Sequence, residues 1–196
     1  MSGFALETLA GTACAAVADD LARLRVEVFR DWPYLYEGSL DYERKYLAKY
    51  AAIAGATVVV ARAGGRIVGA STALPLSAAE PELQAPFRAA GHDVARVYYY
   101  GESVLQPEWR GRGIGVAFFA AREARAHELG FAVGAFCAVV RPDNHPLRPA
   151  GYVPLDAFWA KRGYVRDPGL AASFTWRDVG ADAATAKPMV FWTKRL

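Results

Sequence analysis

The sequence has few of the residues that build covalent or metal-bound frameworks. It contains two cysteines, two methionines and three histidines among 196 residues. Cys14 and Cys137 lie far apart and form no C-x-x-C pair, so we expect no disulfide framework and a reducing compartment. No histidine has a second histidine or a cysteine at metal-ligand spacing. We therefore expect no metal site.

Long apolar runs and a strong charge of one sign are also missing. No stretch reaches the ~18 uncharged apolar residues that cross a bilayer, and the opening residues M-S-G-F-A-L-E-T lack the basic and apolar regions of a secretory signal. The formal net charge is only +3, and basic residues are interleaved with acidic ones, which is not typical of a dedicated nucleic-acid binder. We expect a cytoplasmic protein with neither a membrane nor a nucleic acid as partner.

The composition is that of a folded globular protein. Charged residues make up 22% and hydrophobic residues 54% of the chain. A chain of this length fits one domain of ordinary size, and we find no linker or internal repeat that would divide it. The prediction is a single domain over residues 1–196.

Hydrophobic periodicity and turn residues predict an alternation of helices and strands. Helices are expected at 19–30, 41–50, 114–129 and 155–161. Strands are expected at 57–61, 67–74, 96–105, 131–140, 173–179 and 189–194. The segment 75–91, with two prolines, is expected to be a loop or a broken helix. Because a helix joins the strands at 96–105 and 131–140, these two should be parallel, and the fold class should be α/β or α+β with a mixed sheet.

A glycine-rich segment opens the helix at 114. Residues 102–117 read E-S-V-L-Q-P-E-W-R-G-R-G-I-G-V-A. Glycine lets a ligand approach the backbone, and the first N–H groups of a helix are free to bind a phosphate. Arg110 and Arg112 add two guanidiniums suited to phosphate oxygens. The segment therefore predicts a phosphate or diphosphate site.

Two common phosphate-binding patterns do not fit. The P-loop pattern G-x-x-x-x-G-K-[ST] is absent. The dinucleotide pattern G-x-G-x-x-G has Val116 in place of its third glycine, and no acidic residue ends the next strand. What remains is R-x-x-G-x-G between a strand and a helix.

This pattern resembles the acyl-CoA-binding loop of the GNAT superfamily of N-acetyltransferases. Several segments in the family's order support the likeness: S-V-L-x-P before the loop, the apolar strand at 131–140, V-R-P-D-N at 140–144, and F-W-A-K-R-G-Y at 158–164. The resemblance implies a GNAT fold, with a mixed central sheet of about six to seven strands and about four helices. It also implies that the family's fourth and fifth strands splay apart.

The resemblance implies the following cofactor contacts. Backbone groups of Val104, Leu105 and Gln106 would bind the pantetheine arm of acetyl-CoA, with an N–H near Leu105 at the developing oxyanion. Such a strand must be irregular, and Gly101 is a plausible bulge site. Asn144 would contact pantetheine. The diphosphate would lie on the segment formed by Arg110, Gly111, Arg112, Gly113, Ile114, Gly115 and Val116.

Two residues are candidates for catalysis. Glu102 follows three tyrosines in the sequence. An apolar setting would raise the pKa of its carboxylate toward neutrality, so that it could act as the base for the acceptor amine. The alternative is that Glu102 pairs with an arginine or faces solvent. Trp159 stands where the family usually has a tyrosine that acts as the general acid. Either the thiolate of coenzyme A leaves without receiving a proton, or another group protonates it. The nearest tyrosines in the sequence are Tyr152 and Tyr164. Tyr152 is our candidate.

Three functions compete at this point. The first is an acetyl-CoA-dependent N-acetyltransferase acting on a primary amine of a small molecule or peptide, with no metal and possible completion of the pocket by a second protomer. The second is a catalytically weak acyl-CoA-binding sensor or interaction module, which Trp159 favours. The third, a basic nucleic-acid-binding domain, is disfavoured by the scattered charge. Six aromatic residues either line an acceptor pocket or simply pack: Trp32, Tyr34, Tyr36, Tyr98, Tyr99 and Tyr100. Cys137 is either a core residue or, with His145, a nucleophile.

Overall fold

The computed structural model describes residues 3–196. The strands are β1 (Ala5–Ala10), β2 (Thr57–Ala63), β3 (Arg66–Pro75), β4 (Val97–Tyr99), β5 (Ser103–Leu105), β6 (Val133–Val139), β7 (Val165–Arg177) and β8 (Ala184–Arg195). The α-helices are α1 (Ala18–Phe29), α2 (Leu40–Ala48), α3 (Pro81–Ala89), α4 (Ile114–Glu128) and α5 (Asp156–Ala160).

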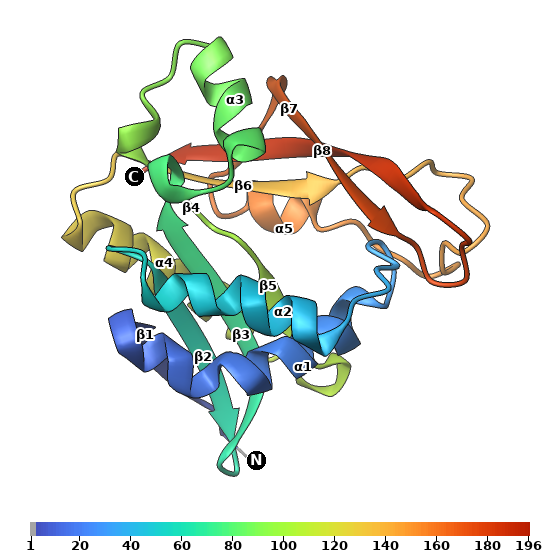
Figure 1. Cartoon of the computed structure of the whole chain (residues 1–196), viewed down its shortest axis with the longest axis horizontal. Coiled ribbons are helices and arrows are strands. Elements are labelled where there is room, and N and C mark those ends of the chain that lie inside the picture. Colours follow the sequence, from blue (N-terminus) through green and yellow to red (C-terminus); the bar gives the residue numbers. More distant parts are fainter. Residues whose placement is uncertain (1–2) are drawn as a thin grey trace.

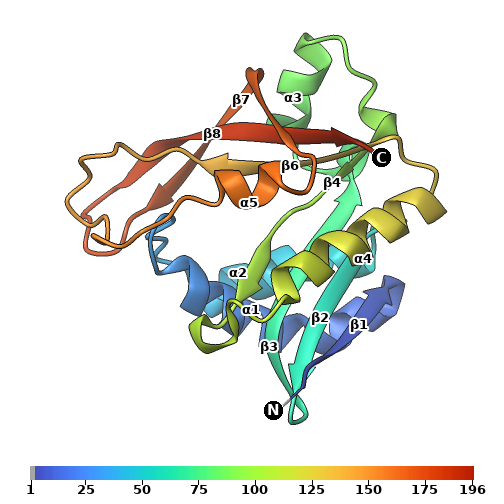
Figure 2. The same cartoon turned by 180° about the vertical axis from the view of Figure 1, so that it is seen from behind.

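The strands form one mixed sheet in the order β1-β2-β3-β4-β6-β8-β7, and β5 pairs with β3 beside β4. Helices α1 and α2 cover one face (Figure 1), and α4 and α5 cover the other (Figure 2). Among residues 3–196, no helix combines the length and apolar character needed to pass through a bilayer. The predicted fold class, including the parallel pairing across helix α4, is confirmed.

The structure also corrects the predicted elements. Strand β1 was not predicted. Residues 81–89, in the segment expected to be a loop or a broken helix, form helix α3, because Pro81 occupies the first helical turn, where no N–H is needed. The predicted strand 96–105 is divided into β4 and β5. The two last strands are longer than predicted, because they pair with each other from Val165–Thr193 at one end to Arg177–Ala184 at the other.

A bulge separates β4 from β5. Tyr99 lies opposite Leu74, whereas Ser103 lies opposite Ser71, so four steps on one strand match three on the other. Gly101 lies within this interval, as predicted, and a Cβ at that position would come within 2.6 Å of the Tyr50 hydroxyl. The bulge therefore requires glycine, and it reverses which side chains of the following residues face each side of the sheet.

Beyond the bulge, β5 and β6 diverge. The parallel pairing of β4 with β6 covers only Val133–Ala135 on β6, and its last bond runs from the Tyr100 N–H to the Ala135 carbonyl, at 2.7 Å. From there β5 follows β3 while β6 follows β8 (Figure 2). The predicted splay is therefore present. It also explains why residues 137–139 are only half-buried, although the apolar run had predicted burial on both faces.

Candidate active site

The strand register shows which backbone groups of β5 face the gap. The Gln106 N–H donates to the Val68 carbonyl at 3.0 Å, and the Glu102 carbonyl accepts from the Thr72 N–H at 3.1 Å. In an antiparallel pair such bonds alternate along the strand. The intervening residues Ser103 and Leu105 therefore point their N–H and carbonyl groups away from β3, toward β6.

Residues of β6 supply the opposite edge. The Val140 N–H donates to the Pro188 carbonyl at 2.8 Å, and the same alternation leaves the backbone groups of Cys137 and Val139 facing β5. An extended amide-containing chain could pair with both edges, as a strand does. Of the three backbone positions predicted on the first strand, only Leu105 presents its N–H to this gap, because β3 uses those of Val104 and Gln106.

The glycine-rich loop lies at the end of β5 and leads into α4. Gly111 and Gly113 have φ values of 73° and 85°, and a Cβ at either would meet open space. Within residues 3–196, the backbone N–H groups of residues 111–116 donate no hydrogen bond. Ile114 is buried in a core cluster and anchors the loop, while Val116 is exposed. The loop therefore offers a bare, open row of amides with a helix N-terminus behind it.

Two arginines extend from this loop. Arg110 is exposed and its Nε donates to the Leu105 carbonyl at 3.4 Å, so it lies over the end of β5. Arg112 donates to the Glu108 carbonyl at 3.1 Å and stacks on the Trp109 ring at 4.7 Å. Both guanidiniums lack a carboxylate partner among the described residues and are free to pair with phosphate oxygens. The loop thus offers the amides and guanidiniums that suit a diphosphate.

Glu102 lies at the bulge, and the structure places it in an ion pair rather than in a purely apolar setting. Its Oε2 lies 2.5 Å from Nη1 of Arg25 on α1. Nε of the same arginine lies 2.5 Å from Oε2 of Glu43 on α2. All three side chains are buried. Two carboxylates therefore share one guanidinium, and this buried triad carries one excess negative charge.

The arginine at the centre of the triad is held by aromatic rings. Its guanidinium lies over the rings of Tyr46 at 4.5 Å and Phe29 at 5.1 Å. Burial acts to lower the pKa of Arg25, but the charges of Glu102 and Glu43 outweigh it, so the pKa is raised and the cation persists. The remaining carboxylate oxygens, Oε1 of Glu102 and of Glu43, are buried and have no hydrogen-bond partner within residues 3–196.

Arg122 of α4 supports the bulge from the opposite face of the sheet. It is only 2% exposed, and it donates to the carbonyls of Glu102 and Phe118, both at 3.2 Å. Its guanidinium also lies 4.5 Å from the centre of the Tyr100 ring. Arg122 of α4 therefore holds the backbone of Glu102, whereas Arg25 of α1 holds its side chain.

The other sequence candidates lie around the loop that follows β6. Tyr152 packs edge-on against Trp32 at 5.8 Å, and burial followed by the charge of Asp156 raises its pKa. Asn144 is exposed in the same loop. Trp159 packs against Phe136 and Trp192, at 5.1 and 5.2 Å.

The Cys137 thiol is half-buried and lies 3.1 Å from the Tyr99 hydroxyl. Burial raises its pKa to about 11, so it stays protonated at neutral pH. A thiolate nucleophile at this position is therefore disfavoured. Among residues 3–196, no three His, Cys, Asp or Glu side chains gather as metal ligands would.

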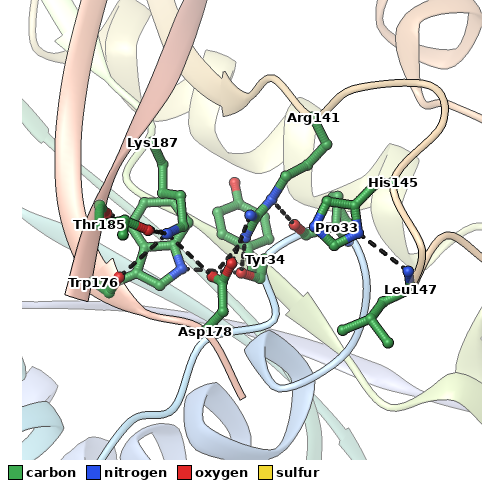
Figure 3. A network of polar contacts seen from close by, with 9 residues as sticks. All are labelled: Pro33, Tyr34, Arg141, His145, Leu147, Trp176, Asp178, Thr185 and Lys187. Carbon is green, nitrogen blue, oxygen red and sulfur yellow. Dashed lines mark hydrogen bonds and ion pairs between the residues drawn. The ribbon is translucent and has the colours of Figure 1, made fainter. Parts of the chain in front are cut away.

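A clamp of polar contacts holds the aromatic loop between α1 and α2 (Figure 3). Arg141, just after β6, donates to the Pro33 and Tyr34 carbonyls at 2.8 and 2.6 Å. It also forms a bidentate pair with Asp178, at 2.8 Å for both bonds. Lys187 approaches Asp178 from the other side at 3.4 Å. Segments from three regions of the chain are thereby fixed around one carboxylate.

Loss of that carboxylate should destabilise the protein. Burial on its own would raise the pKa of Asp178, but the hydrogen bond and charge of Arg141 and the charge of Lys187 hold it below its ordinary value. Asp178→Asn should lower the free energy of unfolding by about 1–3 kcal/mol at neutral pH, because two buried cations lose their partner. Denaturant unfolding measures the change.

The stability that Asp178 contributes should depend on pH in a definite direction. A depressed pKa adds stability above the unfolded-state pKa and loses it as pH falls through the folded-state pKa. The difference between the parent and Asp178→Asn should therefore shrink in acid. Asp182→Asn, at an exposed aspartate near the same turn, is the control and should change little. An equal loss in both variants would contradict the clamp.

Sequence reasoning missed the side chains that hold this site. Arg25 falls at helical spacing with Leu21 and Val28 on the apolar side of α1, and an arginine on a buried face is a signal that a carboxylate partner lies nearby. Arg122 is similarly placed on an alanine-rich helix. The residues of the clamp gave no such signal, because they meet only through the folding of distant segments.

The comparisons with known proteins agree with this geometry. The model of the acetyltransferase (GNAT) family matches residues 18–164. The chain belongs to the GNAT acetyltransferase family. No curated protein matches the sequence significantly.

Solved structures share the fold of this GNAT protein at low sequence identity. A ribosomal-protein-alanine N-acetyltransferase from Brucella melitensis has a TM-score of 0.65 at 15% identity, covering 98% of this chain and 99% of the other. An N-acetyltransferase from Staphylococcus aureus has a TM-score of 0.62 at 12% identity, covering 99% of each chain. A proposed acetyltransferase from Salmonella typhimurium, solved with its cofactor acetyl-CoA, has a TM-score of 0.58 at 12% identity, covering 100% and 95%.

Proposed function

We propose that this GNAT protein transfers an acetyl group from acetyl-CoA to a primary amine of a small molecule or peptide. One observation carries the proposal: the gap between β5 and β6 ends at a loop whose exposed amides are unbonded within residues 3–196. An extended amide chain attached to a diphosphate matches both features at once. Acetyl transfer follows from membership of the family, and the primary amine as acceptor is what we add to it.

Different groups of the chain would bind different parts of acetyl-CoA. The amides of residues 111–116, with Arg110 and Arg112, would hold the diphosphate. The gap-facing N–H of Leu105 would hold the acetyl carbonyl oxygen, where a fixed donor stabilises developing negative charge. Acetyl-CoA, once bound, supplies the reactive thioester. Asn144, which is exposed in the loop after β6, is our candidate for contact with the pantetheine arm.

Glu102 is our candidate for the base. A primary ammonium has a pKa of about 10, so at neutral pH a base must remove its proton before attack. The triad formed with Arg25 and Glu43 carries one excess negative charge, and accepting one proton removes that excess. Tyr152 is the candidate that returns a proton to the departing thiolate. Its half-buried ring and raised pKa keep the phenol protonated at neutral pH.

An acceptor screen tests the proposal. Acetyl-CoA is incubated with the protein and panels of aminoglycosides, amino acids, polyamines and peptide N-termini, while the released CoA thiol is followed with a thiol reagent. Thiol release that depends on one amine class, with acetylated amine found by mass spectrometry, is the expected result. Acetyl-CoA binding by calorimetry without turnover on any panel would instead favour the sensor, and absence of binding would overturn both functions.

A further inference from the structure

A short chain of hydroxyl groups lies behind the bulge. The Tyr46 and Tyr50 hydroxyls on α2 and the turn after it are 3.3 Å apart, and the Tyr50 hydroxyl is 3.0 Å from Oγ1 of Thr72 on β3. A Cβ on Gly101 would lie 2.6 Å from the Tyr50 oxygen and 3.7 Å from the Tyr46 oxygen. The chain therefore passes directly beside the residue that precedes Glu102.

Arg25 contacts both the Glu102 carboxylate and the ring of Tyr46. Its guanidinium pairs with Glu102 at 2.5 Å and stacks on the Tyr46 ring at 4.5 Å. Burial, more than any other effect, raises the pKa of both Tyr46 and Tyr50, so each phenol keeps its hydrogen. A phenol that keeps its hydrogen can pass a proton on only by accepting one as it releases its own.

A cavity of about 240 Å³ borders these two tyrosines. It is lined by Tyr46, Tyr50, Ile53, Leu74 and the segment 78–80, with Lys49 at its edge. Lys49 and Glu80 form an ion pair at 3.3 Å, and their side chains are 59% and 41% exposed, so this end reaches solvent. The volume is ample for several waters, and the Lys49–Glu80 ion pair at its edge provides polar partners for them.

We propose that the Tyr46 and Tyr50 hydroxyls and this cavity form the route by which a proton leaves Glu102 for solvent. The inference rests on the proposed function, in which Glu102 takes the proton of the amine. The Glu102 side chain is only 3% exposed, and bound substrates would fill the gap in front of it. The proton therefore needs a path on the opposite side.

The transfer balances without an ionised phenol. The O–H bond of protonated Glu102 breaks, and its proton passes, directly or through one water, to the Tyr46 oxygen. Tyr46 releases its own hydrogen to Tyr50 or to a cavity water, and the final proton enters solvent between Lys49 and Glu80. Arg25 and Glu43 face the inner end and keep their charges throughout.

The test compares Tyr46→Phe/Tyr50→Phe with Tyr98→Phe. The double variant removes the hydroxyls and retains the rings. Tyr98 is a buried tyrosine whose hydroxyl donates to the Gly55 carbonyl and accepts from the Thr57 hydroxyl, both at 2.8 Å, on the opposite side of the sheet. With an accepted amine, the double variant should lower kcat about tenfold and raise the solvent deuterium isotope effect. The KM for acetyl-CoA should not change, and the control should match the parent in both.

A second measurement does not depend on acetyl transfer. Infrared difference spectra after a pH jump follow the protonated-carboxyl band that disappears in Glu102→Gln. Its rate of appearance should fall about tenfold in the double variant but not in Tyr98→Phe. If no amine is acetylated and the band still slows, the proposed function fails and the route stands. If transfer occurs but neither kcat nor the band rate changes in the folded double variant, or if no Glu102 band forms, the route is wrong.

Discussion

Gly113→Asp is expected to abolish measurable acetyl-CoA binding. Gly113 is the N-cap of α4, with φ at 85° and open space around its missing Cβ. An aspartate there would place a carboxylate among the amides that we assign to the diphosphate. Repulsion between this carboxylate and the diphosphate next to it should cost several kcal/mol of binding free energy. That cost corresponds to a loss of at least about 100-fold in affinity. Isothermal calorimetry with acetyl-CoA measures it directly.

Gly130→Asp provides a matched control. Gly130 follows the other end of the same helix, also has a positive φ, at 79°, and is also surrounded by open space. Both variants carry similar backbone strain and the same added charge, but the helix dipole favours an aspartate at the N-terminal position and disfavours one at the C-terminal position, so Gly130→Asp should be the less stable of the two. Only the change at Gly113 should affect the ligand. Unchanged acetyl-CoA affinity in Gly113→Asp would overturn the assignment of the loop.

The predictable part of this molecule is the part encoded by neighbouring residues. The loop at 110–115 could be located because its glycines, its arginines and the helix that follows all lie in one short segment. Gly101 could be suggested as a bulge because a strand tolerates glycine poorly unless the backbone needs it. The family resemblance then ordered the strands and predicted their divergence, which composition alone does not do.

Pairing with an arginine was one of the alternatives for Glu102 and is what the structure shows, but the choice among the alternatives could not be made in this way. The tyrosine neighbours of Glu102 in sequence suggested an apolar surrounding, but a bulge decides which face of the sheet a side chain joins. With one extra residue in the strand, the carboxylate turns toward α1 and meets Arg25, which is already paired with Glu43. Contacts of this kind depend on where separate helices cross the sheet, and periodicity carries no information about that.

Glu102→Gln should lower kcat at neutral pH by about 10²–10⁴-fold, the usual contribution of a positioned base. Glutamine keeps the shape of the side chain but cannot take a proton from the amine. Acetyl-CoA affinity should stay within about twofold, since the diphosphate loop is separate. The pH dependence has a definite sign: as pH rises toward about 10, more of the acceptor is already neutral. The ratio of parent rate to variant rate should therefore fall with pH.

Glu43→Gln separates chemistry from charge balance. Glu43 is the other buried carboxylate on Arg25, and its replacement leaves the triad with the same net charge as Glu102→Gln. Both variants retain one carboxylate for the guanidinium, so both should fold. If Glu102 is the base, only its replacement removes the group that receives the proton, and the Glu43 variant should retain the larger activity and the pH profile of the parent. Equal losses in the two variants would mean that the triad acts through its charge and its packing, because a base has to be one particular carboxylate.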